Sequence, residues 1–169
     1  MSDPIELTKL QASLKNIIDE KGFSQTDKRL NRTVQALPGH FVVITNQLLL
    51  EWLRTQKLLE KYKDDSKRMY SSFRRIMSEA KKDPNSRRLM VFNDSKYSET
   101  YECFTHFQFV YTQRNEFDMI VYQRSSDLEK LKDDLIFFSH QMRKFERGTD
   151  HYVTKLVIVY AHVHYQTEK

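Results

Sequence analysis

Apolar residues recur along the chain with two spacings, one typical of helices and one typical of strands. Steps of three and four residues predict helices over residues 3–22, 46–62, 66–82 and 126–146. Alternating or continuous apolar runs predict strands over residues 40–44, 89–92, 103–111, 117–123 and 152–165. The polar residues 113–116 predict a hairpin turn between two of these strands, and the polar, basic residues 24–37 predict a loop before a Pro38-Gly39 turn.

These elements predict one α+β domain, in which helices pack on a single mixed β-sheet. A chain of 169 residues buries one core, and no repeat or linker divides it. The continuous apolar centre of the last strand, Leu156-Val157-Ile158-Val159, is typical of a strand that is covered on both faces. The sequence shows no run of about 18 apolar residues and no signal-peptide pattern, so it predicts a soluble, cytoplasmic protein without a membrane partner.

Charge and cysteine content narrow the function. The net charge of +5 and the pI of about 9.2 favour an anionic partner, either a nucleotide phosphate, a nucleic acid or an acidic protein surface. The exposed face of the predicted helix 66–82 is strongly basic. Cys103 is the only cysteine and has no partner for an internal disulfide, so it is either a buried core residue or a nucleophile.

Polar motifs cluster between residues 86 and 127, at the ends of apolar strands. They are the turn Ser86-Arg87-Arg88, the spacing Cys103-x4-Gln108-Phe109, and the run Gln123-Arg124-Ser125-Ser126-Asp127. Together these motifs resemble the thymidylate synthase and pyrimidine nucleotide hydroxymethylase family. The resemblance extends over residues 83–165 and more loosely over the N-terminal half, and it implies a compact, thymidylate synthase-like domain.

The resemblance also implies an activity. Family members transfer a one-carbon unit to C5 of a pyrimidine deoxynucleoside monophosphate, with 5,10-methylenetetrahydrofolate as the cofactor. In that role the Cys103 thiolate would add to C6 and make C5 nucleophilic, and a neighbouring arginine would stabilise the thiolate. Glu102 and Phe104 replace the proline and histidine that flank the family's cysteine, so a buried, unreactive Cys103 stays an alternative.

A second part of the resemblance concerns phosphate. A guanidinium beside a hydroxyl at a strand end, as in Arg124-Ser125, can hold a phosphate through several hydrogen bonds. Ser126 or Asp127 would equally cap the helix that follows. The resemblance implies a homodimer in which the paired arginines of one subunit reach the phosphate in the other. The implied nucleotide-binding set is Arg32, Arg87, Arg88, Gln123, Arg124, Ser125, Asp127 and His162.

The C-terminal strand departs from the family pattern. His162 matches a family histidine that binds the deoxyribose, but His164 stands at the tyrosine position and Tyr165 follows one residue later. Because a slip of one residue reverses the face of a strand, Tyr165 does not simply substitute. His162 and His164 share a face at spacing two, and without a third ligand at an evident spacing the sequence predicts no metal site.

Further departures affect the base and the cofactor. Leu135 stands where the family has its base-reading asparagine, directly after Asp133 and Asp134, so the choice between uracil and cytosine stays open. Glu51-Trp52 is the nearest counterpart of the folate-site residues, and the chain ends four residues after Tyr165, where the family continues. Two hypotheses follow: a compact transferase, or a catalytically inactive member that binds protein or nucleic acid. Its compact form suggests a phage origin.

Overall fold

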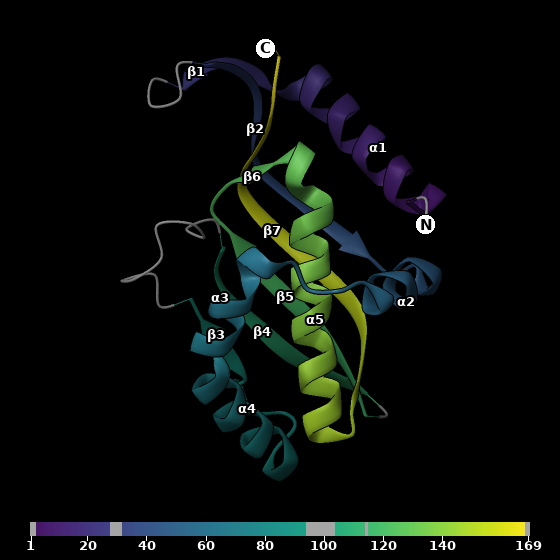
Figure 1. Ribbon diagram of the computed structural model, residues 1–169, viewed down its shortest axis with the longest axis vertical. Helices are drawn as coiled ribbons and strands as arrows, with labels where there is room; N and C mark the ends of the chain where they lie inside the picture. The colour runs from purple at the N-terminus through teal and green to yellow at the C-terminus, as the bar shows by residue number, and fades with distance from the viewer. Residues whose placement is uncertain (1–2, 28–31, 94–103, 114, 168–169) are drawn as a thin grey trace.

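The computed structural model describes residues 3–27, 32–93, 104–113 and 115–167 (Figure 1). In chain order the elements are α1 (Ile5–Lys21), β1 (Phe23–Asp27), β2 (Arg32–Ile44), α2 (Gln47–Thr55), η1 (Glu60–Tyr62), α3 (Lys63–Arg68), α4 (Tyr70–Lys82), β3 (Met90–Phe92), β4 (Phe104–Gln113), β5 (Glu116–Gln123), β6 (Ser126–Asp127), η3 (Leu128–Lys130), α5 (Leu131–Thr149) and β7 (Tyr152–Gln166).

The described strands form one mixed sheet of seven strands. Six of them follow the order β1-β2-β7-β5-β4-β3, and β6 pairs with β7 beyond the end of β5. Neighbouring strands are antiparallel, except that β5 and β6 run parallel to β7. The structure therefore confirms an α+β fold with a single mixed sheet, and it confirms the hairpin between β4 and β5.

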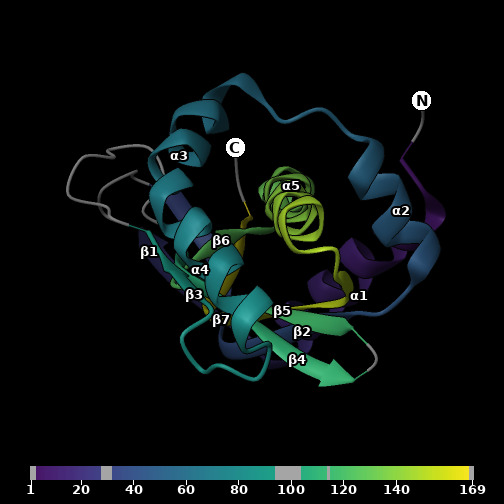
Figure 2. The same cartoon turned by 90° about the horizontal axis from the view of Figure 1, so that it is seen from below.

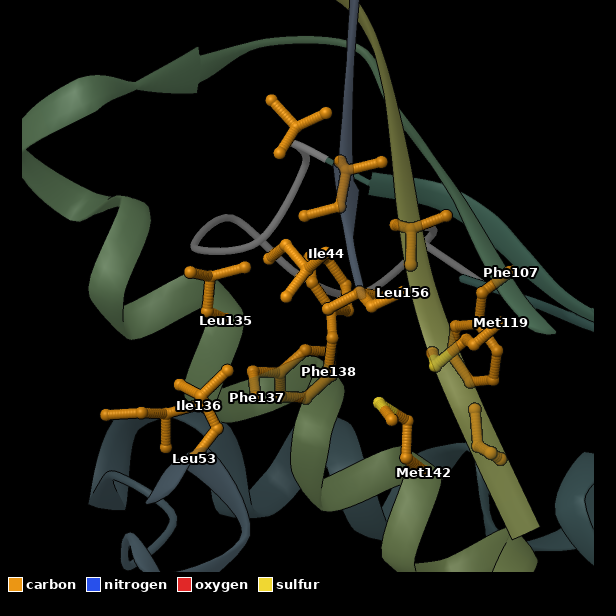
Figure 3. Packing of buried hydrophobic residues seen from close by; sticks show 14 of the residues in the cluster. Ile44, Leu53, Phe107, Met119, Leu135, Ile136, Phe137, Phe138, Met142 and Leu156 are labelled. Carbon is orange, nitrogen blue, oxygen red and sulfur yellow. The ribbon is translucent and has the colours of Figure 1, made fainter. Parts of the chain in front are cut away.

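One face of the sheet carries the core. The alternating buried residues of β5 (Phe117, Met119 and Val121) face α5, and the Phe145 ring of α5 stacks 3.9 Å from that of Phe109 on β4. Figure 3 shows Phe138 and Met142 of α5 packed towards the buried side of β7. Burying each such large side chain contributes about 1.5–3 kcal/mol, so this layer supplies much of the stability.

The opposite face of the sheet is left uncovered by the helices (Figure 2). Phe41 and Val43 on β2 are 62% and 48% exposed, and Phe92 on β3 is 59% exposed. Val157 and Val159 of β7 are also partly exposed, so the expectation of a strand covered on both faces is wrong for the single chain. We call this surface the open face. Its residues are Phe41, Val43, Phe92, His106, Val110, Ile120, Tyr122, Val157 and Val159.

The loop predicted over residues 24–37 is wrong. Residues 24–27 belong to β1 and residues 32–37 to β2, and the two strands pair antiparallel, with Phe23 opposite Ala36. Val34 and Ala36 are buried while Gln35 between them is partly exposed, as expected of a strand with one covered face. Pro38 and Gly39 make no turn, because they lie within β2, where Gly39 adopts a φ of 63°.

The predicted helix boundaries also need correction. The predicted helix 46–62 ends at Thr55, and the predicted helix 66–82 is divided at Met69 into α3 and α4. The last helix starts at Leu131 because Ser126–Asp127 is extended and pairs with β7. It continues past Gly148 to Thr149 and ends at Asp150, which adopts a left-handed φ of 58°.

Candidate functional site

The ends of three parallel strands meet at one edge of the sheet. Gln123, the last residue of β5, pairs with Tyr160 of β7, and Asp127 of β6 pairs with His164 further along β7. Arg124 and Ser125 therefore occupy the short connection between β5 and β6, beside the C-terminal half of β7. This edge brings together the Gln-Arg-Ser run and the two histidines that the sequence singled out.

The polar groups at this edge lie close to one another. The Ser125 hydroxyl lies 3.5 Å from Nδ1 of His164, and the rings of His162 and His164 are 5.6 Å apart. Both histidines are partly buried, whereas the Arg124 side chain is exposed. An exposed guanidinium with a hydroxyl and imidazoles beside it suits an anionic ligand that also offers hydroxyl groups.

Asp134, from the first turns of α5, lies behind this edge. Its carboxylate accepts hydrogen bonds from Gln123 Nε2 at 2.8 Å, from the Ser126 hydroxyl at 3.0 Å and from the Tyr62 hydroxyl at 3.3 Å. The residue as a whole keeps some exposed surface, but its carboxyl group is withdrawn from water, and this burial raises the pKa of Asp134 despite the three donors. Sequence patterns alone did not assign this cluster, because its members come from four separate elements.

Two buried polar atoms beside this cluster lack a hydrogen-bond partner within the described residues. They are Oε1 of Gln123 and the hydroxyl of Tyr160. Burial, and then the nearby Asp134, raise the pKa of Tyr160, and the close Ser126 hydroxyl opposes this shift without reaching hydrogen-bond geometry to the phenol. Buried polar atoms are seldom left unsatisfied, so these two atoms mark an incomplete part of the hydrogen-bond network behind this edge.

Asp127 takes a local role. Its Oδ1 accepts a hydrogen bond from the backbone N–H of Glu129 at 3.1 Å and so caps the 3₁₀ turn η3. The capping interpretation is therefore confirmed for Asp127. The Ser126 hydroxyl bonds Asp134 instead.

Arg87 and Arg88 lie elsewhere in the chain. Ser86 shapes their turn by donating to Glu79 at 2.8 Å and accepting from the Arg88 N–H at 3.3 Å, and both arginines are exposed. The strand that follows begins at Met90, which lies level with Ile120 of β5. Since Ile120 precedes Arg124 by four residues, the turn is more than roughly 13 Å from Arg124 along the strands. One chain thus does not bring the paired arginines to the Arg124 edge.

Tyr165, Arg32 and Cys103 were also singled out in the sequence. Tyr165 points to α1, where its hydroxyl donates to Asp19 and its ring lies 4.6 Å from Lys15 Nζ, so it holds α1 to β7. Arg32 begins β2, where its backbone pairs with that of Asp27, and its contact with phosphate stays a prediction. Cys103 lies outside the described residues.

A comparison with models of known protein families shows the family of this chain. The thymidylate synthase family model matches residues 18–164, which is most of the chain. A search among curated proteins gives no match. The chain belongs to the thymidylate synthase family, and the resemblance drawn from its motifs is confirmed. Members of this family are transferases that bind a pyrimidine nucleotide, are usually dimeric and generally use methylenetetrahydrofolate.

The cofactor of the family can be tested against the residues present. Glu51, the nearest counterpart of the family's proton-relay glutamate, is exposed and pairs with Arg54 at 2.8 Å. Arg54 in turn bonds Glu146 and the carbonyl of Val153, at the start of β7 and opposite the His162 end. Trp52 lies near Lys132 Nζ, 5.8 Å from its ring centre. Glu51 in this position does not fit the proton relay that folate chemistry needs.

The described residues show neither a metal-ligand cluster nor a membrane-spanning helix. In the part of the chain that the structure describes, no three His, Cys, Asp or Glu side chains come close enough to hold a metal ion. Among the described helices, none combines the length and the apolar character needed to cross a membrane.

Exchanging Asp134 for Asn tests the buried carboxyl. An aspartate with a raised folded pKa favours its neutral form, so its stabilisation is present below the ordinary value of about 3.9 and is lost as pH rises through the folded pKa. We expect the free energy of unfolding of the wild type, relative to Asp134→Asn, to fall across that window. Urea denaturation from acidic to neutral pH measures it, and parallel pH curves for the two proteins would contradict it.

Proposed function

We propose that this protein binds a pyrimidine deoxynucleoside monophosphate at the Arg124 edge, with its phosphate on Arg124 and Ser125. The observation that carries the proposal is the meeting of Arg124, Ser125 and the two histidines of β7 at the ends of parallel strands in a thymidylate synthase family chain. A charged hydrogen bond to phosphate from an exposed guanidinium supplies affinity, and the adjacent hydroxyl fixes the direction of the phosphate.

The remaining polar groups suit the nucleoside. His162 is placed to bind the deoxyribose hydroxyl that the family resemblance implies, with His164 between it and Ser125. The base would lie towards Gln123, whose buried Oε1 lacks a partner in the described part of the chain; once the side chain becomes accessible, this oxygen would accept from a ring N–H or an amino group. Asp134, bonded to the other end of the same amide, sets the orientation of Gln123.

Cys103 is the candidate for the nucleophile that the family chemistry requires. Phe104, the residue that follows it in the chain, pairs with Gln123 and thus lies next to the Arg124 edge. In the family chemistry the Cys103 thiolate would add to C6 of the base, and the electron pair of the C5–C6 double bond would make C5 nucleophilic. Because Glu51 does not fit the proton relay, we propose that nucleotide binding is retained and that folate-dependent transfer is not.

A homodimer through the open face completes the nucleotide site. The exposed apolar side chains of β2 and β3, together with the partly exposed ones of β5 and β7, form a surface of the kind that a second subunit buries. Gln108 of β4 donates to the carbonyl of Arg87 at 3.5 Å, which ties the paired arginines to this sheet. Arg87 and Arg88 of the partner subunit would then reach the phosphate that Arg124 holds.

The phosphate contact is tested with Arg124→Ala. Losing a charged hydrogen bond of about 1.5–3 kcal/mol is expected to raise the Kd for dUMP or dCMP about 10- to 150-fold. Isothermal titration measures the Kd, with Arg147→Ala at an exposed site on α5 as the matched control. Affinity for the nucleoside without phosphate should not change. Equal binding of the nucleotide by Arg124→Ala and the wild type would refute the phosphate site.

The dimer is tested with Val159→Lys in the middle of the open face. Burying an unpaired ammonium in an apolar interface costs several kcal/mol, so this variant is expected to be a monomer where the wild type is a dimer. Light scattering at micromolar concentration measures the mass, with Ala12→Lys on the exposed side of α1 as the control. A monomeric wild type would contradict the shared site.

The transfer chemistry is tested by trapping Cys103. We expect 5-fluorodeoxyuridine monophosphate with methylenetetrahydrofolate to give no stoichiometric covalent adduct, because Glu51 lies beside Arg54 near the start of β7, opposite the His162 end. Intact-protein mass spectrometry measures the adduct. Cys103→Ser should bind dUMP as tightly as the wild type. A rapid adduct that Cys103→Ser lacks would show a working transferase and overturn this expectation.

A further inference from the structure

Helix α4 is divided lengthwise into an apolar side and a basic side. Phe73, Ile76 and Ala80 are buried against the rest of the domain. The opposite side consists entirely of exposed residues, and we call it the α4 basic face. Its residues are Tyr70, Ser71, Arg74, Arg75, Ser78, Lys81 and Lys82. No acidic side chain belongs to it.

The basic residues repeat in pairs along this part of the chain. Lys67-Arg68 at the end of α3, Arg74-Arg75 and Lys81-Lys82 follow one another at intervals of seven residues. Seven residues are nearly two helical turns, so the two pairs within α4 share one side and lie about 10.5 Å apart along the axis. Figure 1 shows α3 leading directly into α4.

The charge of the whole protein is concentrated here. Residues 63–88 contain nine lysines and arginines and four acidic residues, a surplus equal to the net charge of +5 of the chain. Arg74, Lys81 and Lys82 form no ion pair with any described residue. Glu79, the acidic residue of α4, accepts a hydrogen bond from Ser86. Lys63 and Lys67 pair with Glu60 and Asp64, so the cations left without an ion pair to a described residue include those of α4.

The α4 basic face is also held firmly in place. Arg75 donates from its two terminal nitrogens to the carbonyls of Arg88 and Met90, which fastens α4 to the start of β3. At the other end a cavity of about 390 Å³ adjoins the face, lined by Ser66, Lys67, Tyr70 and Lys144. Lys144 Nζ donates to the carbonyl of Ser66 at 3.1 Å, so a further cation is fixed at this end.

We propose that the α4 basic face binds the sugar-phosphate backbone of a nucleic acid without reading its base sequence. A duplex carries one negative charge per about 1.7 Å of its axis, so the distance of about 10.5 Å between the two basic pairs of α4 spans several phosphates, and each pair can contact one of them. The hydroxyls of Ser71 and Ser78, between these pairs, are the side chains that donate to phosphate oxygens. Tyr70, which is 57% exposed, offers a ring or a hydroxyl at the end of the face.

A nucleic acid fits this surface better than an acidic protein does. Two basic pairs lie on one side of α4 and a third ends α3, and a phosphate backbone likewise offers many like charges in a row. The surface offers no large apolar side chain besides Tyr70, although the centre of a protein interface normally needs several. The face is separate from the Arg124 edge, so the inference does not depend on the nucleotide site.

The test uses the triple variant Arg74→Ala, Lys81→Ala and Lys82→Ala. Fluorescence anisotropy is measured with a labelled DNA duplex, and with single-stranded DNA and RNA of the same sequence, over a series of salt concentrations. We expect the wild type to bind, and the triple variant to bind more than about tenfold more weakly at low salt. The log–log salt slope should fall by about two to three, because each lysine or arginine lost removes about one contact.

The control is a second triple variant, Lys9→Ala, Lys21→Ala and Lys57→Ala, which removes the same charge from exposed positions outside α4. It should bind nearly as tightly as the wild type, and both triple variants should keep the wild-type affinity for dUMP if the fold and the nucleotide site are intact. Equal losses in the two variants would show a mere net-charge effect. That result, displacement of DNA by polyglutamate at a lower charge concentration than by competitor DNA, or no wild-type binding at low salt would overturn the inference.

Discussion

The parallel pairing of β5 with β7 is the constraint on which the rest of the structure depends. Parallel neighbours cannot be joined by a tight turn, so the chain crosses from one to the other through β6, η3 and α5. The crossover lays α5 on one face, where Phe145 packs against Phe109 and Phe117. It also places β6, which follows the end of β5, beside the C-terminal half of β7. The core, the open face and the Arg124 edge all follow from this one connection.

Much of this fold could be predicted from the sequence, because its strongest elements carry their signal locally. The apolar stripe of α5 and the apolar centre of β7 both specify burial on the core side. The failure at residues 24–37 has a physical cause: β1 is an edge strand with polar, exposed residues, and its pairing to β2 depends on contacts that no local pattern contains. Likewise the break at Met69 lies within a continuous helical pattern.

The candidate site could be predicted only in part, for a related reason. Arg124 and Ser125 are adjacent in the chain, so a short motif was enough to find them. The Asp134 cluster joins residues from η1, β5, β6 and α5, and Tyr62 is separated from Asp134 by 72 positions. Such a cluster appears only when the tertiary structure is known. The same holds for Tyr165. The alternation of β7 sets the face on which its side chain lies, but its hydrogen bond to Asp19 of α1 depends on the tertiary structure.

The Arg124 edge and the α4 basic face do not depend on the proton relay that the family's transfer reaction needs. The Arg124 edge needs only the ends of β5, β6 and β7. A proton relay also needs a carboxylate that reaches this edge, and Glu51 lies beside Arg54 near the start of β7 instead. The α4 basic face needs neither, because α4 packs on β3 and α5 through its apolar side and presents its cations to solvent. Loss of transfer chemistry would therefore leave the proposed nucleotide site at the Arg124 edge intact. It would also leave the α4 basic face intact, since no hydrogen bond among the described residues links Arg74, Lys81 or Lys82 to that edge.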